Sequence, residues 1–581
     1  MSLYDKNVKA LAGLRAFMRA RGVSAFLITG ADPHGSEYAC PRFREREYIS
    51  GFTGSAGVVV VTEDEAALWT DGRYFLQAEK ELAPGFTLYK SGAPGALDFT
   101  GYLAALPEGA VVGVNPRYLS ESAHRRLTAR GVRLKWVHED FWAGRPALPE
   151  GPVYELDLKY AGLTREEKLA AVRRELRKWR AQGYLASELE SVAWLYNLRG
   201  SDLPGVPVFF AYALIFQEEE AAFLEGSSAE KTLSKERLFY GGEYNAVEDA
   251  LKNFDGKILY NPDKTSAYMA GLLKNGLPLK DDVITRLKAV KNETEIRNLR
   301  ETHVFDGACM FRLIKHIKEA FGNTEIYEGD IDGIIDKLRA ERPDYRGPSF
   351  DTIAAFAENA ALMHYNPRNN PPRRLAAGGF LLIDTGGQYL GGTTDITRTI
   401  ALGEVTPAMK RDFTLVLKAH IAAAAAKWLR GASGAVIDGY ARKPLWDEGL
   451  DYKCGTGHGV GAFLSVHEGP QRLKYDSAAP LEPGMVTTIE PGVYREGKLG
   501  IRTENVFLCY LAEENENGQF LRWEPLSLCP MDLSAVDAGM LTEAEKEWLN
   551  GYHELVYEKL APLLNTEETG ILKEYTRRVR L

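Results

Sequence analysis

The stretch LLIDTGGQYLGGTTDITRTI, residues 381–400, decides how the C-terminal half of this chain is interpreted. Its apolar start is typical of a buried strand, yet the run ends on Asp384, and Asp395 follows eleven residues later. A single Asp at a strand end is usually a turn or cap residue. Here the glycine-rich connection TGGQYLGGTT can fold the chain back as a hairpin, which would direct both carboxylates into one site. Because two close carboxylates repel, they need a shared proton or a cation.

Three further polar side chains have the same setting. His458 lies in GTGHGVG, Glu490 in MVTTIEPGVY and Glu504 in GIRTENVFL, each after an apolar, β-rich run. Strands that end together would deliver these side chains to one rigid location, as a metal site requires. Four carboxylates and one imidazole can hold two divalent ions about 3.5 to 4 Å apart when some carboxylates bridge. The oxygen-rich set favours Mn²⁺, with Zn²⁺ and Co²⁺ as competitors.

The phrases IDTGGQYLGGTTDITRT, GTGHGVGAFLSVHEGP, IEPGVY and GIRTENV together resemble the metal-ligand signature of the pita-bread metallopeptidases, family M24. Within that group the chain is most similar to the long, three-domain cytosolic form of Xaa-Pro aminopeptidase. GADPHGSEY (30–38), FTGSAGVVVVTEDEAALWTDGRYFLQAE (52–79) and WLYNLRGSDLPGVPVFFAYALI (194–215) resemble the first two domains of that form. The resemblance implies an α/β (α+β) chain, with two N-terminal creatinase-like α/β domains followed by a C-terminal pita-bread metallopeptidase domain.

The same resemblance implies a dinuclear metallo-exopeptidase that releases the N-terminal residue from peptides with proline in the second position. Two divalent ions per chain, usually manganese, would share the hydroxide that attacks the Xaa-Pro bond. The implied metal ligands are Asp384, Asp395, His458, Glu490 and Glu504. Glu490 would also carry a proton during the reaction.

Four more residues are candidates for substrate contact, and the resemblance implies that two of them, both histidines, face the substrate. His467 in SVHEGP would stabilise the tetrahedral intermediate, and His364 in ALMHYNP would contact the peptide around the proline. Arg502, two residues before Glu504, matches an arginine beside the metals. Arg73 in WTDGRYF would reach over the site to limit substrate length. Each also has a plain structural interpretation: a hydrogen-bonding histidine, a salt bridge for Arg502, and a strand-helix junction for Arg73.

One position departs from the family pattern. In cytosolic members the phrase around the histidine ligand begins HGTGHG, whereas this chain reads CGTGHG and has Cys454 at the first position. A thiol cannot act as a cation at neutral pH. We therefore expect altered substrate affinity or pH dependence, with metal binding preserved because His458 remains. A nucleophilic role for Cys454 is disfavoured, because an activated thiolate needs a dedicated base.

The domain organisation is predicted from the length of the chain and from its proline-rich segments. A chain of 581 residues is too long for one core, and residues 142–157 form a proline-rich boundary. We predict an α/β domain at 1–145, a second at 146–287, the catalytic domain at 288–525 and a helical extension of it at 526–581. The phrases at 47–57 and 194–205 both lead from aromatic residues into a Gly/Ser turn, which leaves a duplication of the first two domains open.

Local signals predict several helix ends. Thr164 with Glu167 and Thr542 with Glu545 form capping boxes. A helix begins at Thr406, with Pro407 at its first position, and is expected to run to about Leu429. The last amphipathic helix, from Thr542 to Leu560, must bury its apolar face in its own domain or against a partner subunit.

Composition excludes several classes of protein. The net charge of −9 comes without a basic stripe, so a nucleic-acid partner is not expected. No apolar run approaches the roughly 20 residues of a bilayer-spanning helix, so no membrane partner is expected either. The five dispersed cysteines, without a CxxC pair, indicate a reducing compartment and a cytoplasmic protein. The family resemblance, by contrast, implies peptide substrates and a second copy of the chain as partners, the latter in a homodimer through the C-terminal domain.

Two alternative functions remain at this level. The first is a prolidase-type Xaa-Pro dipeptidase, which has the same ligand types but generally a shorter chain. The second is a pita-bread protein without peptidase activity that acts as a binding module. Intact metal ligands argue against the second alternative.

Overall fold

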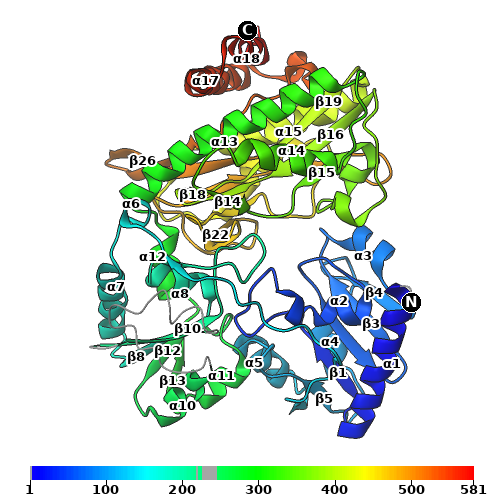
Figure 1. Ribbon diagram of the computed structural model, residues 1–581, viewed down its shortest axis with the longest axis vertical. Coiled ribbons are helices and arrows are strands. Elements are labelled where there is room, and N and C mark those ends of the chain that lie inside the picture. Colours follow the sequence, from blue (N-terminus) through cyan, green and yellow to red (C-terminus); the bar gives the residue numbers. More distant parts are fainter. Residues whose placement is uncertain (1–2, 218–219, 225–244, 581) are drawn as a thin grey trace. The chain divides into compact units, whose positions relative to one another are not determined.

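The computed structural model describes residues 3–217, 220–224 and 245–580 (Figure 1). The chain forms two units, of which the first contains residues 1–156 and 163–284 and the second contains residues 157–162 and 285–581. Each unit combines helices with sheets, as the predicted α/β (α+β) class requires. Within the described residues, no helix has both the length and the apolar character needed to cross a bilayer. The four domain ranges stay predictions.

The first sheet of the N-terminal unit has six strands in the order β4-β3-β2-β1-β5-β6. Its central strand β1 pairs antiparallel with β2 and parallel with β5. The elements of this half are α1 (Leu3–Arg21), β1 (Ala25–Ile28), α2 (Glu45–Ser50), β2 (Val58–Thr62), β3 (Ala66–Thr70), α3 (Phe75–Glu81), β4 (Phe86–Lys90), α4 (Phe99–Ala104), β5 (Val112–Val114), α5 (Glu121–Ala129) and β6 (Leu134–Trp136).

The second sheet repeats this arrangement with the order β11-β10-β8-β12-β13. Here β8 pairs antiparallel with β10 and parallel with β12. In the first sheet, β1 likewise pairs antiparallel with β2 and parallel with β5. Two sheets of the same pattern favour the duplication that the sequence left open. The remaining elements are β7 (Tyr154–Glu155), α7 (Arg165–Lys178), β8 (Gly183–Ala186), α8 (Leu189–Leu195), β9 (Leu198–Arg199), β10 (Ala211–Phe216), β11 (Glu220–Leu224), α10 (Ala246–Asn253), β12 (Ile258–Tyr260), α11 (Ala267–Leu272), β13 (Gly276–Pro278) and α12 (Val283–Ala289).

The C-terminal unit carries two main sheets. One has the order β15-β16-β19, and the other has the order β20-β27-β26-β23-β21-β22. The helix α13 runs along the first sheet (Figure 1). Its side chains Leu313 and Ile317 share a buried cluster with Leu381 and Ile383 of that sheet. The elements of this unit are α6 (Leu158–Ala161), α13 (Glu293–Ala320), α14 (Asp330–Arg339), β14 (Tyr345–Pro348), β15 (Ile353–Phe356), β16 (Gly379–Thr385), β17 (Gly387–Tyr389), β18 (Gly392–Thr393), β19 (Ile396–Leu402), α15 (Pro407–Ala424), β20 (Trp428–Leu429), α16 (Gly434–Trp446), β21 (Gly457–Gly459), β22 (Glu468–Leu473), β23 (Val486–Ile489), β24 (Gly492–Arg495), β25 (Leu499–Arg502), β26 (Asn505–Asn515), β27 (Gly518–Pro525), α17 (Glu543–Leu560) and α18 (Thr566–Tyr575).

The predicted hairpin is confirmed. Strands β16 and β19 pair antiparallel, with Asp384 opposite Thr397 and Thr385 opposite Ile396. The connection between them contains two short strands, β17 and β18, which pair with each other, and β17 also pairs with β14. The hairpin of β17 and β18 is packed so tightly that little room is left for side chains. This packing explains why the connection is rich in glycine. A Cβ on Gly386 would lie 2.0 Å from the Thr394 carbonyl oxygen.

The predicted helix ends are mostly correct. Both capping boxes are present, and Thr406 caps α15 with Pro407 in its first turn. The prediction that this helix runs to about Leu429 is wrong, because α15 ends at Ala424. Trp428 instead belongs to β20, pairs with Leu521 and packs its ring 4.6 Å from that of Trp523. Burial of this large side chain through strand pairing outweighs the helix propensity of the alanine run.

The last amphipathic helix, α17, buries its apolar face within its own domain. Leu549, Val556 and Leu560 pack with Phe311 of α13 and Leu417 of α15 in one buried cluster. Of the two possibilities that the sequence left open, the structure therefore shows the first.

Candidate metal centre

The five predicted ligands are brought to one region by strand ends of the C-terminal unit. Asp384 is the penultimate residue of β16, and Asp395 directly precedes β19. Glu504 lies between β25 and β26, and Glu490 follows β23. His458 is the central residue of the short strand β21. Strands of both main sheets thus contribute to the site.

Distances show how close the side chains are. Ligand atoms of Asp395, His458 and Glu504 all lie within 4.8 Å of one another. The Nε2 atom of His458 lies 3.6 Å from Asp395 Oδ2 and 3.6 Å from Glu490 Oε1. These separations are those of groups around a common centre rather than of direct hydrogen bonds.

The ring of His458 is held in an orientation suited to ligation. Its Nδ1 lies 2.9 Å from the Gly459 carbonyl oxygen, so the Nδ1–H group donates there and Nε2 is left to face the carboxylates. Its backbone N–H donates to Thr488 Oγ1 at 3.1 Å. The Glu490 N–H donates to the Thr456 carbonyl at 2.7 Å, which ties the strand ends of β21 and β23 together.

The carboxylates destabilise one another electrostatically. Burial raises the pKa of Asp395 well above its usual value, and the charges of Glu504, Asp384 and Glu490 add to the effect. Burial and the charges of Glu490 and Asp384 likewise raise the pKa of Glu504. Among the described residues, Asp384 also has a buried Oδ1 atom with no hydrogen-bond partner. A donor set of this kind fits divalent cations, which would neutralise the charge and use the idle oxygen.

Arg502 and Thr397 contact two of these acids from outside the cluster. The Arg502 guanidinium pairs with Asp384 Oδ2 and donates to the Tyr494 hydroxyl at 2.7 Å. Burial opposes the Arg502 charge, but Tyr494 and Asp384 outweigh it and raise the Arg502 pKa. Thr397 Oγ1 donates to Glu504 Oε2 at 2.6 Å. Thr397 and Tyr494 were not predicted, although the period of two in a strand places Thr397 on the same side as Asp395.

His467 and His364 both lie beside this cluster. The His467 ring stands edge-on to that of His458, with 4.2 Å between their centroids. His364 follows Met363, whose carbonyl faces the Arg502 guanidinium at 3.4 Å. The loop that carries His364 is anchored by buried Glu328, which accepts hydrogen bonds from the Phe356 N–H and the Tyr365 hydroxyl.

Glu468 is a further residue that sequence analysis missed. It follows His467 and is buried between the ammonium groups of Lys288 and Lys291, with Lys288 Nζ 3.2 Å from Oε2. All three side chains are at most 3% exposed. This buried triad holds the strand end that carries His467. The two lysines lie more than 170 residues away, so no local pattern could have found it.

Arg73 and Cys454 complete the predicted set. Arg73 belongs to the N-terminal unit, where its guanidinium pairs with Asp71, 2.7 Å from Oδ2. Cys454 belongs to the C-terminal unit, is partly exposed, and packs in the same apolar cluster as Tyr494. Its carbonyl accepts a hydrogen bond from Arg442 Nη2 at 2.7 Å. Tyr494, in turn, accepts a hydrogen bond from Arg502.

Comparisons with protein families match nearly the whole chain. Residues 297–510 match metallopeptidase family M24, and residues 519–579 match the C-terminal region of peptidase M24. Residues 11–145 and 144–295 each match the creatinase/prolidase N-terminal domain. Two matches to the same kind of domain agree with the repeated sheet topology.

Individual relatives match over similar lengths. A protein of Laccaria bicolor named "Probable Xaa-Pro aminopeptidase P" is 37% identical, over 98% of this chain and 93% of the relative. One of Coprinopsis cinerea with the same name is 36% identical, over 97% of this chain and 96% of the relative. Among solved structures, the X-prolyl aminopeptidase from Caenorhabditis elegans, described as a cytosolic enzyme with a di-nuclear active site, has a TM-score of 0.94. It is 31% identical and covers 99% of this chain and 100% of its own.

Proposed function

Because this chain belongs to metallopeptidase family M24, we propose that it is a Xaa-Pro aminopeptidase. Such an enzyme uses metal to release the N-terminal residue of a peptide whose second residue is proline. The observation that carries the proposal is the group of four carboxylates and one imidazole at the converging strand ends. A cluster of acids that is this unfavourable without cations is typical of a two-metal hydrolase.

Asp384, Asp395, His458, Glu490 and Glu504 are the residues that would hold the two ions. When bound, the ions would lower the pKa of water and polarise the scissile carbonyl group. The hard oxygen ligands favour manganese, with zinc or cobalt as substitutes. The di-nuclear active site described for the Caenorhabditis elegans enzyme supports the number of ions.

The protein's own residues supply proton transfer and charge. Glu490 is the ligand whose side chain is most accessible, 21% exposed against 6% for Asp395, so it is placed to pass a proton between water and the leaving nitrogen. His467, beside His458, would donate a hydrogen bond to the oxygen on which charge develops. Arg502 pairs with Asp384 and so orients its carboxylate.

Four further assignments, on peptide binding, substrate length, location and oligomeric state, complete the proposal. His364 and Arg502 would bind the peptide near its proline, and Arg73 would limit substrate length. The described cytosolic location of the Caenorhabditis elegans enzyme supports a cytoplasmic protein. Large apolar side chains exposed on α16, namely Val436, Tyr440 and Trp446, support a homodimer through the C-terminal domain.

A Xaa-Pro dipeptidase is the alternative with the same metal chemistry. A prolidase structure from Thermococcus sibiricus has a TM-score of 0.52 and is 22% identical, but it covers only 64% of this chain. That likeness concerns the fold alone. The full-length agreement with aminopeptidase P relatives favours the aminopeptidase, because the dipeptidase fold leaves a third of this chain unmatched.

The test is hydrolysis of a Xaa-Pro-Yaa tripeptide and a Xaa-Pro dipeptide, with and without Mn²⁺. We expect Mn²⁺-stimulated release of the first amino acid from the tripeptide, and a loss of at least about 100-fold in kcat for Glu490→Gln, the scale of a general acid-base contribution. Glu496→Gln changes an exposed glutamate six residues away and serves as the matched control. Equal cleavage by wild type and Glu490→Gln would refute the assigned chemistry, and preference for the dipeptide would favour the prolidase alternative.

A further inference from the structure

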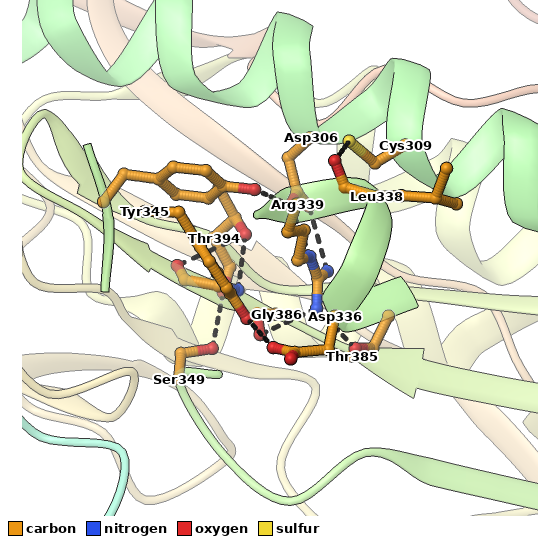
Figure 2. Close-up of polar contacts among 12 residues, drawn as sticks. Asp306, Cys309, Asp336, Leu338, Arg339, Tyr345, Ser349, Thr385, Gly386 and Thr394 are labelled. Carbon is orange, nitrogen blue, oxygen red and sulfur yellow. Dashed lines mark hydrogen bonds and ion pairs between the residues drawn. The ribbon is translucent and has the colours of Figure 1, made fainter. Parts of the chain in front are cut away.

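A buried ion pair lies directly behind the metal-binding hairpin. It joins Arg339, the last residue of α14, to Asp306 of α13 (Figure 2). Their side chains are 1% and 3% exposed. Arg339 Nε donates to Asp306 Oδ1 at 2.7 Å, and Nη2 donates to Oδ2 at 3.2 Å. The Tyr389 hydroxyl donates to the same Oδ1 at 2.7 Å. None of these three residues belongs to the proposed ligand set.

The free arm of Arg339 reaches one side of the hairpin. Its Nη1 donates to Thr385 Oγ1 at 2.7 Å and to the Gly386 carbonyl at 2.9 Å (Figure 2). Thr385 is the neighbour of Asp384 and ends β16. The guanidinium therefore fixes both the side chain and the backbone of the segment that immediately follows one proposed ligand.

The network continues to the other side of the hairpin through Gly386. Ser349 Oγ donates to the Thr394 carbonyl at 3.0 Å, and the Gly387 N–H donates to Thr394 Oγ1 at 2.9 Å. Thr394 is the neighbour of Asp395. Gly386 is packed so closely that a Cβ there would lie 2.0 Å from the Thr394 carbonyl oxygen and 2.3 Å from Ser349 Oγ. Any shift of Gly386 would therefore be passed to Thr394 and so to Asp395.

Stability alone does not explain why this buried position holds two charged side chains. Desolvation of two buried charges cancels most of their attraction, so apolar side chains of similar volume would stabilise the fold as well or better. What apolar side chains cannot supply is a planar fork of donors that grips a carboxylate, a hydroxyl and a carbonyl at once. Burial by itself would lower the pKa of Arg339. The charges of Asp306 and Tyr389 outweigh this effect and raise the pKa, so the guanidinium stays charged.

We propose that Asp306 and Arg339 are positioning residues for metal binding, which hold the ends of β16 and β19 so that Asp384 and Asp395 present their oxygens at a fixed separation. The pair acts from α13 and α14, so these helices set the geometry of a site to which they contribute no ligand. The inference rests on the proposed metal-dependent function. Residues that orient metal ligands typically contribute 10- to 100-fold to metal affinity.

The experiment measures metal binding itself. Mn²⁺ is titrated into the full-length protein, freed of metal by chelation, and followed by calorimetry and by electron paramagnetic resonance. We expect Arg339→Lys, which keeps the positive charge but loses the fork, to bind Mn²⁺ about 10- to 100-fold more weakly than wild type. Activity should return toward the wild-type kcat at saturating Mn²⁺, because no group that touches substrate has changed.

Two further variants make the result decisive. Arg312→Lys alters another arginine of the same domain and serves as the control. Arg312 pairs at 3.0 Å with Glu568, which is not a proposed ligand, so this variant should bind Mn²⁺ as wild type does. Thr385→Val keeps the shape of a buried side chain and removes one acceptor of the Arg339 fork, so it tests the proposal even if Arg339→Lys fails to fold. Wild-type Mn²⁺ affinity in folded Arg339→Lys, or in Thr385→Val if Arg339→Lys does not fold, would overturn the positioning role and leave the proposed function intact. A wild-type protein that binds no Mn²⁺ would overturn both.

Discussion

At the residue scale, Cys454 stands where the family resemblance led us to expect a histidine. The side chain is partly exposed and packs near Tyr494, whose hydroxyl accepts a hydrogen bond from Arg502. Burial raises the pKa of Tyr494, so its hydroxyl stays protonated at neutral pH. Neither Cys454 nor Tyr494 therefore supplies a positive charge here, whereas a histidine at 454 would become a cation in acid.

We expect Cys454→His to change KM for a Xaa-Pro-Yaa tripeptide and to add an ionisation near pH 6.5 to the pH profile of kcat/KM. Cys454→Ser cannot titrate in this range and serves as the control, with a profile like that of wild type. Metal content, measured by elemental analysis, should stay unchanged in both variants because His458 is retained. Complete loss of activity in Cys454→Ser would instead point to the thiol as a nucleophile.

At the element scale, a buried arginine links α17 to the backbone of the proposed ligand Glu504. Arg398 of β19 donates to the Glu504 carbonyl at 2.7 Å and to the Tyr552 hydroxyl of α17 at 2.9 Å. The next residue of α17, His553, accepts a hydrogen bond on Nε2 from the Met531 N–H at 3.1 Å. Burial, together with the charges of Arg398 and Arg577, lowers the pKa of His553 to about 3. The helix is thus built around a neutral imidazole.

This arrangement predicts acid sensitivity. Between pH 6.5 and about 3 the unfolded chain binds a proton at His553 that the folded chain does not, so stability falls as pH falls, by about 1.4 kcal/mol per pH unit at most. His553→Gln keeps an acceptor for the Met531 N–H but cannot titrate. Its free energy of unfolding should fall by about 1 kcal/mol less than that of wild type between pH 6.5 and 5.5, as measured by urea denaturation. Parallel losses in the two proteins would show that His553 is not the titrating group.

At the scale of the whole molecule, the question is whether the chain works as a pair. Val436, Tyr440 and Trp446 of α16 are 45%, 46% and 53% exposed. At 3.6 residues per turn they fall within roughly 120° of the helix circumference, so they form one apolar face. Single exposed apolar residues are normal on a protein surface, but three on one helix are typical of an interface.

We expect light scattering coupled to gel filtration to give about twice the 64.5 kDa mass of the chain, and Trp446→Glu to give the monomer mass. A buried carboxylate without a partner would cost the interface several kcal/mol, which is enough to separate two copies at micromolar concentration. Leu563→Glu is the control, because this side chain is similarly exposed, at 43%, but lies after α17. A wild-type protein that elutes as a monomer would contradict the proposal.

Much of the candidate site could be predicted because its signals are local. The hairpin of residues 381–400 follows from apolar alternation and glycines, and a carboxylate at a strand end is visible within ten residues of sequence. Helix starts at Thr164, Thr406 and Thr542 follow from capping chemistry that spans four positions. The end of α15 could not be found in this way, since it depends on where Trp428 is buried.

By itself, then, the sequence determined which side chains are available for metal chemistry and which strand ends carry them, because residue type and strand period are properties of neighbouring positions. Only the tertiary structure decided what holds those side chains in place. Three buried contacts join positions that are 46 to 177 residues apart: Arg339 with Thr385, Lys291 with Glu468, and Arg398 with Tyr552. Such pairings arise when helices pack on sheets and buried charges must find partners, and no local pattern of sequence encodes that choice.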